Sequence, residues 1–190
     1  MLVLMLNVNI LPEDYILALG TLEPRKNFKL LLKAFVELKR ENLIKDKLVI
    51  VGRKGWKYDG ILNGIEKDIL EDIFFTGFVE TNELPYIYRR ASLFVLPSIY
   101  EGFGIPAIEA SSMECIVLTS DIEVFKEILQ DKVVYFKSNN VLDLKKKILQ
   151  IKEFDERDKM KVKMELVENS KKYNWTNEAL KLLNVIEEKR

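Results

Sequence analysis

The stretch Leu93-Phe-Val-Leu-Pro-Ser-Ile-Tyr-Glu-Gly-Phe-Gly-Ile-Pro-Ala-Ile-Glu109 predicts a buried strand, a loop and the start of a helix. Its first four residues are apolar, which is typical of a strand that is buried on both faces of a parallel sheet. Gly102 and Gly104 in the loop allow a positive φ or a close approach of the backbone to a ligand. Pro106 suits the first turn of a helix, because its missing N–H would be unpaired there. The stretch therefore indicates one strand–loop–helix unit of an α/β fold.

The same kind of strand recurs along the chain. Short runs rich in Val, Ile and Phe lack polar alternation and end at turn residues, and apolar stripes of helical spacing, such as Phe28 to Leu38 and Val141 to Ile151, lie between them. This alternation predicts an α/β, doubly wound, mainly parallel six-stranded Rossmann-like sheet with flanking helices. The expected strands are residues 15–19, 47–51, 73–76, 93–96, 116–119 and 133–136.

Composition excludes several classes of function. The 30 basic and 30 acidic residues cancel, so no global field attracts nucleic acid or an acidic membrane, and we expect no nucleic acid partner. The chain has no histidine, which excludes serine–histidine and cysteine–histidine catalysis within it and argues against zinc hydrolysis.

Cysteine use and hydropathy point to a cytoplasmic protein. The single cysteine, Cys115, cannot form an internal disulfide and is interpreted as a small apolar residue of a buried strand. No apolar run approaches the ~20 residues of a membrane span. Residues 1–6 are apolar but lack the basic flank and the cleavage site of a signal peptide.

The end of the chain has a different character. Residues 153–172 are densely charged, and Met160, Met164 and Val167 form a narrow apolar seam. Tyr173-Asn-Trp-Thr176 interrupts this segment, and Thr176 suits the N-cap of a last helix. No strand follows, so we expect this helix to fold back on its own domain or to mediate self-association, because monomers seldom leave large apolar patches bare.

Ligands of open parallel sheets bind where the carboxyl ends of strands lead into helix N-termini. The loop Gly20-Thr-Leu-Glu-Pro-Arg-Lys-Asn27 follows the first strand and places Arg25 and Lys26 directly before a helix. Free backbone N–H groups and the helix dipole favour an anion there, and the two cations would complete a phosphate site. A solvated loop with two surface charges explains this segment alone equally well.

Two glutamates flank the glycines of the second loop. Glu101 lies in the loop and Glu109 about one turn inside the helix, so we expect both carboxylates to face the same strand-end crevice. A carboxylate can accept hydrogen bonds from two neighbouring hydroxyls, as a ribose or hexose offers. The alternative is that both only complement the helix dipole, at roughly 0.3–1 kcal/mol each. It is the weaker one for a glutamate beside Ala110 amid apolar strands.

These segments resemble the C-terminal, donor-binding domain of retaining glycosyltransferase family 4 (glycosyl transferases group 1), which has the GT-B fold. The resemblance is carried by residues 20–27, 51–56 and 75–79, and above all by Glu101-Gly-Phe-Gly-Ile-Pro-Ala-Ile-Glu109. It implies that the chain is the C-terminal half of a GT-B fold. It also implies a hexosyltransferase that moves a hexose from a nucleoside-diphosphate sugar to an acceptor hydroxyl.

The resemblance also implies the roles of individual residues. Glu109 would bind the ribose, Glu101 would contact the transferred sugar, and Lys26 would hold the diphosphate with Arg25 beside it. Amides near Gly102 to Gly104 would reach the sugar and the phosphates, and the Phe78–Val79 loop would border the base. The implied donor-binding residues are Gly20, Thr21, Arg25, Lys26, Phe78, Val79, Gly102, Phe103, Gly104 and Glu109, with Glu101 as the candidate catalytic residue.

No metal and no cofactor are expected, because such enzymes use cations and helix N-termini in place of a metal ion, and no Asp-x-Asp occurs. Thr21 stands where many members have an arginine, so one phosphate cation is absent or replaced. Glu114 and Gln130 stand where members commonly have glycine. Each replacement costs about 1 kcal/mol if the backbone needs a positive φ at that residue.

The resemblance assigns the domains as well. Residues 1–14 are interpreted as a remnant of an interdomain linker, 15–172 as a nucleotide-sugar-binding Rossmann-like domain, and 173–190 as a C-terminal crossing helix. The N-terminal acceptor domain is absent from this chain, so its expected partners are a nucleotide sugar and that domain or an equivalent chain. We expect no transfer by this chain alone.

Other functions stay open. The chain could be a non-catalytic nucleotide-sugar-binding module or a split-enzyme subunit. A nicotinamide-dependent oxidoreductase lacks support because no Gly-x-Gly-x-x-Gly follows the first strand. A partner-binding domain could use Trp56, Tyr86 and Tyr88 as anchors, although aromatic residues at such spacing are more often core. The donor is GDP-mannose or a UDP-sugar, and the loops at 20–27 and 55–56 resemble those of GDP-mannose users.

Overall fold

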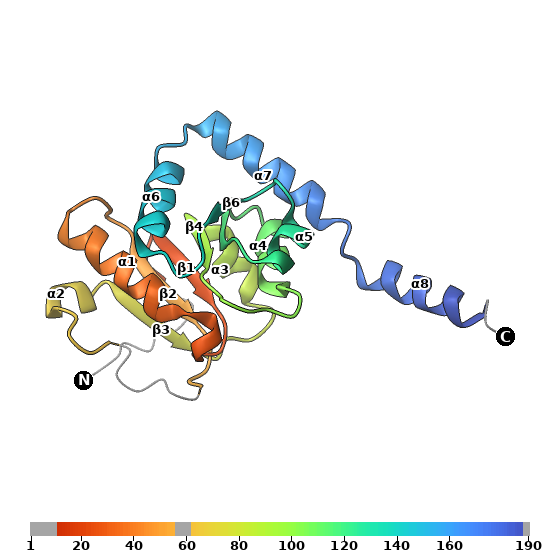
Figure 1. The fold of residues 1–190 in the computed structure, drawn as a ribbon, viewed down its shortest axis with the longest axis horizontal. Coiled ribbons are helices and arrows are strands. Elements are labelled where there is room, and N and C mark those ends of the chain that lie inside the picture. The colour runs from red at the N-terminus through yellow and green to blue at the C-terminus, as the bar shows by residue number, and fades with distance from the viewer. Residues whose placement is uncertain (1–10, 56–61, 188–190) are drawn as a thin grey trace.

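The computed structural model describes residues 11–55 and 62–187 of the chain, and its centre is one parallel sheet. The strand order is β3-β2-β1-β4-β5-β6, and every neighbouring pair is parallel (Figure 1). This order confirms the predicted doubly wound, Rossmann-like sheet, and the expected strands agree with it within one residue. The strands are β1 (Tyr15–Leu19), β2 (Lys47–Val51), β3 (Ile73–Gly77), β4 (Leu93–Leu96), β5 (Val117–Ser120) and β6 (Val134–Phe136).

Helices cover both faces of the sheet. Alternate residues of β1 enter different cores: Ile16 and Ala18 pack with α1, α2 and α6, whereas Tyr15 and Leu17 pack with α3, α4, α5 and α7. Burial on both faces is why the strands are continuously apolar. The helices are the 3₁₀ turn η2 (Pro24–Lys26), α1 (Phe28–Arg40), α2 (Lys67–Leu70), α3 (Leu84–Arg90), α4 (Ile105–Ser112), α5 (Glu123–Leu129), α6 (Val141–Lys152), α7 (Glu156–Ser170) and α8 (Trp175–Glu187).

The strand order reverses between β1 and β4, so the loops that follow these two strands meet at the carboxyl edge of the sheet. The loop after β1 is held against the loop after β2 by backbone hydrogen bonds, including Leu22 N to Arg53 O at 3.0 Å. Gly52 permits this approach. Its φ is 150°, and a Cβ there would lie 2.0 Å from the carbonyl oxygen of Gly20.

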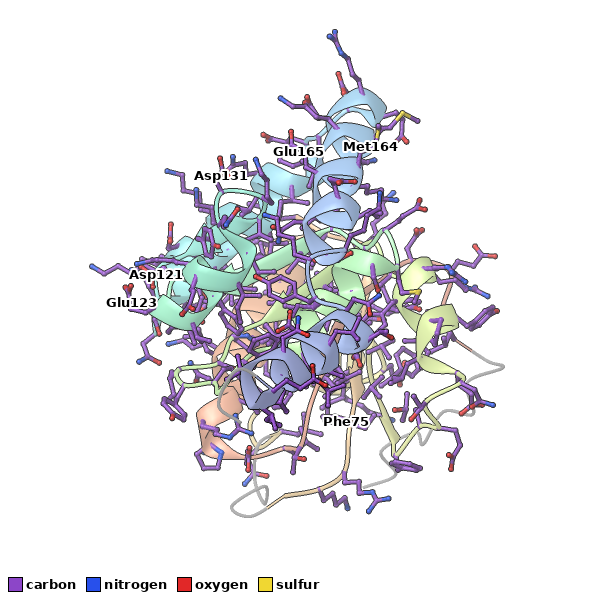
Figure 2. All side chains as sticks on the ribbon, turned by 90° about the vertical axis from the view of Figure 1, so that its right-hand side faces the viewer. Phe75, Asp121, Glu123, Asp131, Met164 and Glu165 are labelled. Carbon is purple, nitrogen blue, oxygen red and sulfur yellow. The ribbon has the colours of Figure 1, made fainter. Side chains whose placement is uncertain are left out.

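The prediction that Met160, Met164 and Val167 form an apolar seam is wrong for the two methionines of α7. Met160 and Met164 are 65% and 67% exposed, and Figure 2 shows Met164 on the outer side of α7. The helix instead buries Leu166, Asn169 and Ser170. Asn169 lies on this inner side because its Nδ2 donates to the carbonyl of Ile128 at 3.0 Å, so a polar residue occupies a buried position that an apolar count misses.

The start of α8 also differs from the prediction. The helix begins at Trp175, and the Oδ1 of Asn174 accepts a hydrogen bond from the backbone N–H of Thr176 at 2.9 Å. Asn174 is therefore the cap, two residues before the predicted one. Beyond its start α8 extends away from the sheet, so it does not fold back on the domain (Figure 1). Its exposed apolar side chains include Leu180, Leu182, Leu183, Val185 and Ile186.

Both positions where glycine was expected have positive φ. The φ of Glu114 is 58° just after α4, and Gln130 at the end of α5 has φ 53° and ψ −137°. The condition for a conformational cost is therefore met at both residues. The cost at Gln130 is the larger one, because its φ and ψ lie close to a region that glycine almost alone adopts.

We expect Gln130→Gly to raise the free energy of unfolding by about 1 kcal/mol, because relief of the strained backbone outweighs the added freedom of the unfolded chain. Gln150→Gly is the matched control. Gln150 is exposed in the last turn of α6, where the backbone is helical and glycine costs up to about 0.5–1 kcal/mol. Urea denaturation of both variants checks the pair, and two variants that are destabilised alike would contradict the prediction.

Candidate functional site

The loop between β1 and α1 places one buried and one exposed cation at the carboxyl edge of the sheet. After Gly20 the chain forms the turn η2, and Asn27 in the left-handed conformation (φ 53°) leads into α1. Lys26 is only 7% exposed, whereas the side chain of Arg25 is 43% exposed. A Cβ on Gly20 would lie 3.1 Å from Cε of Lys26, so glycine leaves the path for the lysine side chain.

Glu101 joins this loop to the loop after β4. Its Oε1 accepts from Nζ of Lys26 at 2.6 Å, and its Oε2 accepts from Arg25 at 2.9 Å. Ser98, which is fully buried, also donates to Oε1, at 2.7 Å. The backbone N–H of Ile99 donates to the carbonyl of Arg25 at 2.9 Å, so main chain and side chains connect the same two loops.

The electrostatics of Glu101 follow from these contacts. Burial on its own raises the pKa of the Glu101 carboxyl, but hydrogen bonds from Lys26 and Ser98, with the charge of Lys26 and a bond from Arg25, lower it below the usual value. The carboxylate is therefore ionised at neutral pH. Glu23 also pairs with Arg25 at 2.5 Å, so the cations of this cluster are balanced by carboxylates.

Glu109 has a different environment on α4. Its side chain is half-buried, and its Oε2 accepts a hydrogen bond of 3.0 Å from the hydroxyl of Tyr88. Burial raises the pKa of the Glu109 carboxyl, and the bond from Tyr88 lowers it in part. Among the described residues no cation bonds to Glu109 as Lys26 and Arg25 bond to Glu101, and its carboxylate is therefore the better placed of the two to accept hydrogen bonds from a ligand.

The two glycines of the loop after β4, Gly102 and Gly104, differ in whether the fold requires glycine there. Gly104 has φ 87° and precedes α4, and a Cβ there would lie 2.7 Å from the ring of Phe125, so only glycine fits. Gly102 lacks a positive φ, and a Cβ there would meet nothing within 4 Å. The fold therefore does not explain Gly102, and the approach of a ligand to its backbone stays a prediction.

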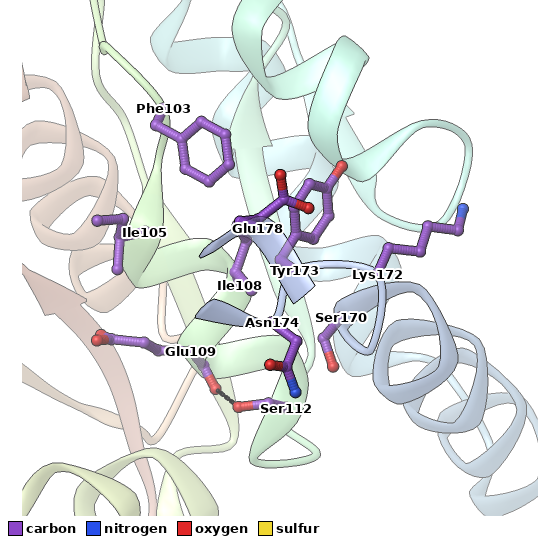
Figure 3. Close-up of a pocket in the computed structure, with 10 residues that line it drawn as sticks. All are labelled: Phe103, Ile105, Ile108, Glu109, Ser112, Ser170, Lys172, Tyr173, Asn174 and Glu178. Atoms are coloured by element: carbon purple, nitrogen blue, oxygen red, sulfur yellow. Dashed lines mark hydrogen bonds between the residues drawn. The ribbon is translucent and has the colours of Figure 1, made fainter. Parts of the chain in front are cut away.

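A cavity of about 780 Å³ lies beside Glu109, between α4 and the start of α8 (Figure 3). The ring of Phe103 packs edge-to-face against Tyr173 on one wall, with centroids 5.7 Å apart. Phe103, Ile105 and Ile108 all line the cavity and give it apolar surface. The first residue of α4, Ile105, lines the cavity, and two predicted site residues, Phe103 and Glu109, line it as well (Figure 3).

The remaining predicted residues lie at neighbouring strand ends. Thr21 is exposed in the loop after β1, and its carbonyl oxygen accepts a hydrogen bond from the N–H of Glu23 at 2.8 Å. Phe78 follows β3 and is 56% exposed, with the guanidinium of Arg53 4.3 Å from its ring centroid. Val79 is buried in the core that also contains Tyr88. Trp56 lies outside the described residues.

Two residues of this region were not predicted as site residues. Ser98 could have been found from its place directly after β4, one residue beyond the strand-ending proline. Tyr88 was considered as a surface anchor, but it is 1% exposed and only its hydroxyl reaches a polar group. No sequence pattern links Tyr88 to Glu109, because they lie on different helices.

The described part of the chain contains neither a metal-binding cluster nor a helix suited to span a membrane. Residues 11–55 and 62–187 contain no group of three or more His, Cys, Asp or Glu side chains placed to hold a metal ion. None of the helices described there combines the length and apolar character that a membrane span requires. Lys26 and Arg25 are the cations that the structure places against Glu101.

Comparison with known proteins gives consistent matches over most of the chain. Residues 8–173 match the family model of glycosyl transferases group 1. The chain is 33% identical to O-antigen chain mannosyltransferase B of Escherichia coli, over 90% of this chain and 45% of that protein. It is 31% identical to an uncharacterized glycosyltransferase of Methanocaldococcus jannaschii, over 91% of this chain and 44% of that protein.

Solved structures share the fold. Sucrose-phosphate synthase from Thermosynechococcus elongatus matches with a TM-score of 0.80 at 20% identity, over 95% of this chain and 47% of that chain. HepE from Anabaena, solved in complex with UDP and glucose, matches with a TM-score of 0.79 at 13% identity, over 93% and 49%. The chain thus has the Rossmann-like fold of GT-B glycosyltransferases and spans about half the length of the proteins it matches.

The two glutamates should affect stability in opposite directions. Glu101→Gln leaves the buried Lys26 without its counter-charge, and we expect a loss of about 1–3 kcal/mol in the free energy of unfolding. Because the folded pKa of Glu101 is lowered, its contribution is present above the ordinary glutamate value of 4.5 and is lost as the pH falls through the folded pKa. Glu109→Gln removes a charge that burial disfavours and should leave stability equal or higher.

Urea denaturation at neutral and acidic pH checks this contrast, with Glu71→Gln at an exposed position as the control. The deficit of Glu101→Gln should shrink at acidic pH. Equal losses in both variants, or a deficit in Glu101→Gln that does not depend on pH, would show that the ion pairs do not hold the loops.

Proposed function

The chain belongs to the family of glycosyl transferases group 1, and on that premise we propose that it is the nucleotide-sugar-binding half of a retaining glycosyltransferase. Its reaction moves a hexose from a nucleoside-diphosphate sugar to an acceptor hydroxyl. The observation that carries this proposal is the cluster of Glu101 with Lys26 and Arg25 at the point where the strand order reverses. Relatives named as mannosyltransferases favour GDP-mannose over a UDP-sugar as the donor.

The leaving diphosphate is the group that the cations stabilise. Its negative charge grows as the bond to the sugar breaks, and preorganised cations and backbone N–H groups stabilise such charge most when they need no reorganisation. Lys26 is already fixed by two loops, and the N-termini of α1 and α4 both lie at this edge. These groups supply the charge stabilisation that a metal ion gives in other transferases.

Glu101 and a bound diphosphate share the same cations. In the proposed complex Glu101 contacts the hydroxyls of the transferred sugar while it keeps Lys26 and Arg25 in place. A carboxylate so close to the diphosphate also repels it. Glu101 therefore improves the position of the sugar at some cost in affinity for the diphosphate itself.

Glu109 binds the ribose in this proposal. Its carboxylate has one oxygen held by Tyr88 and the other available, which suits two neighbouring hydroxyls. The amides at Gly102 to Gly104 lie between the two glutamates in sequence, where they reach the sugar and the phosphates. Phe78 and Val79 border the base at the end of β3.

Binding of GDP and GDP-mannose tests these roles by calorimetry. Glu109→Gln should weaken both ligands by about 1–3 kcal/mol, the range for a hydrogen bond to a charged group. Glu101→Gln should weaken GDP-mannose relative to GDP and leave GDP bound at least as tightly, because the repulsion is removed. Glu71→Gln, at an exposed site, serves as the control.

The titrations are run in EDTA and at two salt concentrations. Binding should persist without divalent cations and weaken as salt rises, because exposed ion pairs are screened. Wild-type affinity in Glu109→Gln would contradict the ribose assignment, and a requirement for magnesium or manganese would contradict the role of Lys26 and Arg25.

Transfer itself should need a second domain. The acceptor hydroxyl must be held close to the anomeric carbon, an effect that contributes ~7–11 kcal/mol in favourable cases. The groups described here all come from one edge of one sheet. We therefore expect these 190 residues alone to bind donor but to transfer no sugar.

Incubation of the purified chain with labelled donors and a panel of acceptors measures this directly. Robust transfer by the chain alone would overturn the proposed half-enzyme. Transfer that appears only after a separate N-terminal domain is added would indicate a split enzyme, and bound donor without transfer in either case would favour a binding module.

A further inference from the structure

We propose that Tyr88 is a positioning residue for the donor: its hydroxyl fixes one oxygen of the Glu109 carboxylate and leaves the other to receive a ligand hydroxyl. The inference rests on the proposed role of Glu109 in nucleotide binding. It adds a residue that touches neither the sugar nor the phosphates and acts only through Glu109.

The contact crosses between two helices. Tyr88 lies on α3 and is 1% exposed, and its hydroxyl donates to Oε2 of Glu109 on α4 at 3.0 Å. Its ring packs edge-to-face on Phe94 of β4, with the centroids 5.4 Å apart. The ring is held by the core, so the position of the hydroxyl is set by the sheet and not by solvent.

The helix that carries Tyr88 is itself anchored. Tyr15 of β1 is fully buried, and its hydroxyl donates to the carbonyl oxygen of Ile87 at 2.6 Å. Ile87 is the residue directly before Tyr88. The two tyrosines therefore form a connection from β1 through α3 to α4, and β1 is also the strand whose loop carries Lys26. Strand β1 therefore helps to position both proposed contacts: the ribose contact through Tyr15 and α3, and the phosphate contact through the loop that carries Lys26.

The hydroxyl can act only as a donor to the carboxylate. Burial raises the pKa of Tyr88 well above its ordinary value, and the negative charge of Glu109 raises it further, so the phenol stays protonated. Burial also raises the pKa of Glu109, and the bond from Tyr88 opposes that rise. Tyr88 therefore favours the ionised form of Glu109, which accepts from ribose hydroxyls and donates to none.

Other charged groups also face the cavity beside Glu109. Lys172 follows α7 and Glu178 lies on α8, and both line the cavity with the phenol of Tyr173. The pKa of the Glu109 carboxyl responds to two effects: burial raises it, and the hydrogen bond from Tyr88 lowers it. Removal of the Tyr88 hydroxyl should therefore move the pKa of Glu109 upward, and the loss of ligand binding in acid should begin at higher pH.

The test is calorimetry with GDP across a range of pH on Tyr88→Phe, Glu109→Gln and the double variant. Phenylalanine keeps the packing on Phe94, so only the hydroxyl is removed. We expect GDP to bind about fivefold more weakly to Tyr88→Phe, the loss of one hydrogen bond, with the acid limb of binding moved to higher pH. In the Glu109→Gln background the Tyr88 substitution should have no further effect on affinity.

Tyr135→Phe is the matched control, because Tyr135 donates to the backbone carbonyls of Phe125 and Gln130 and has no bond to either glutamate. It should change stability without changing GDP affinity or its pH dependence. Tyr15→Phe is a second variant for the case that Tyr88→Phe does not fold. It frees α3 and should weaken GDP binding by a smaller factor, again only while Glu109 is present.

The outcomes separate this inference from the proposed function. Wild-type GDP affinity in Glu109→Gln would contradict the proposed function itself. Weak binding in Glu109→Gln, with wild-type affinity and pH profile in Tyr88→Phe, would overturn the role of Tyr88 and leave the proposed function standing. An equal loss from the Tyr88 substitution in both backgrounds would show that Tyr88 only supports the fold.

Discussion

The pairing of a buried carboxylate with a buried ammonium group is the constraint on which the site depends. Glu101 and Lys26 come from loops 75 residues apart in sequence, and each would be costly to bury alone. The reversed strand order between β1 and β4 is what brings their loops together. The bond from Ile99 N to Arg25 O and the bond from Ser98 to Glu101 lie at the same edge. Together with the ion pair they connect the loops that lead into α1 and α4.

The two glutamates differ in charge environment although the same loop and helix carry them. Hydrogen bonds from two cations and a hydroxyl lower the pKa of Glu101 against the effect of burial, whereas burial raises the pKa of Glu109 and its one phenol partner opposes this only in part. Environments that move two carboxyl groups apart in pKa assign them different tasks. Glu101 organises cations and is balanced by them, and Glu109 keeps capacity to accept from a ligand. The pattern of two glutamates around Gly-Phe-Gly does not contain this difference, because the partners come from β1 and α3.

Sequence alone predicted the strands of the doubly wound parallel sheet, because each strand has a local signal. Continuous apolar runs mark buried strands, and Gly104 with Pro106 marks the start of α4. It did not predict the inner side of α7, where Asn169 is buried by a bond to a carbonyl and two methionines are exposed. It also placed the α8 cap at Thr176 instead of Asn174, since both residues are good caps and only the backbone decides between them. Tyr88 was missed because its bond to Glu109 requires the packing of α3 against α4.

The conformational cost of a side chain differs among three positions with positive φ at helix ends: Gly104, Glu114 and Gln130. At Gly104 a side chain would have both an unfavourable φ and a Cβ 2.7 Å from the Phe125 ring, so α4 or α5 would have to move at the end that faces the site. At Glu114 the cost is a left-handed backbone alone, about 1 kcal/mol, at the opposite end of α4. Gln130 ends α5 with a positive φ as well, and its ψ of −137° makes its cost the larger one. The larger side chains with positive φ thus stand at the C-terminal ends of α4 and α5, whereas glycine occupies the N-terminal end of α4 that would face the phosphates.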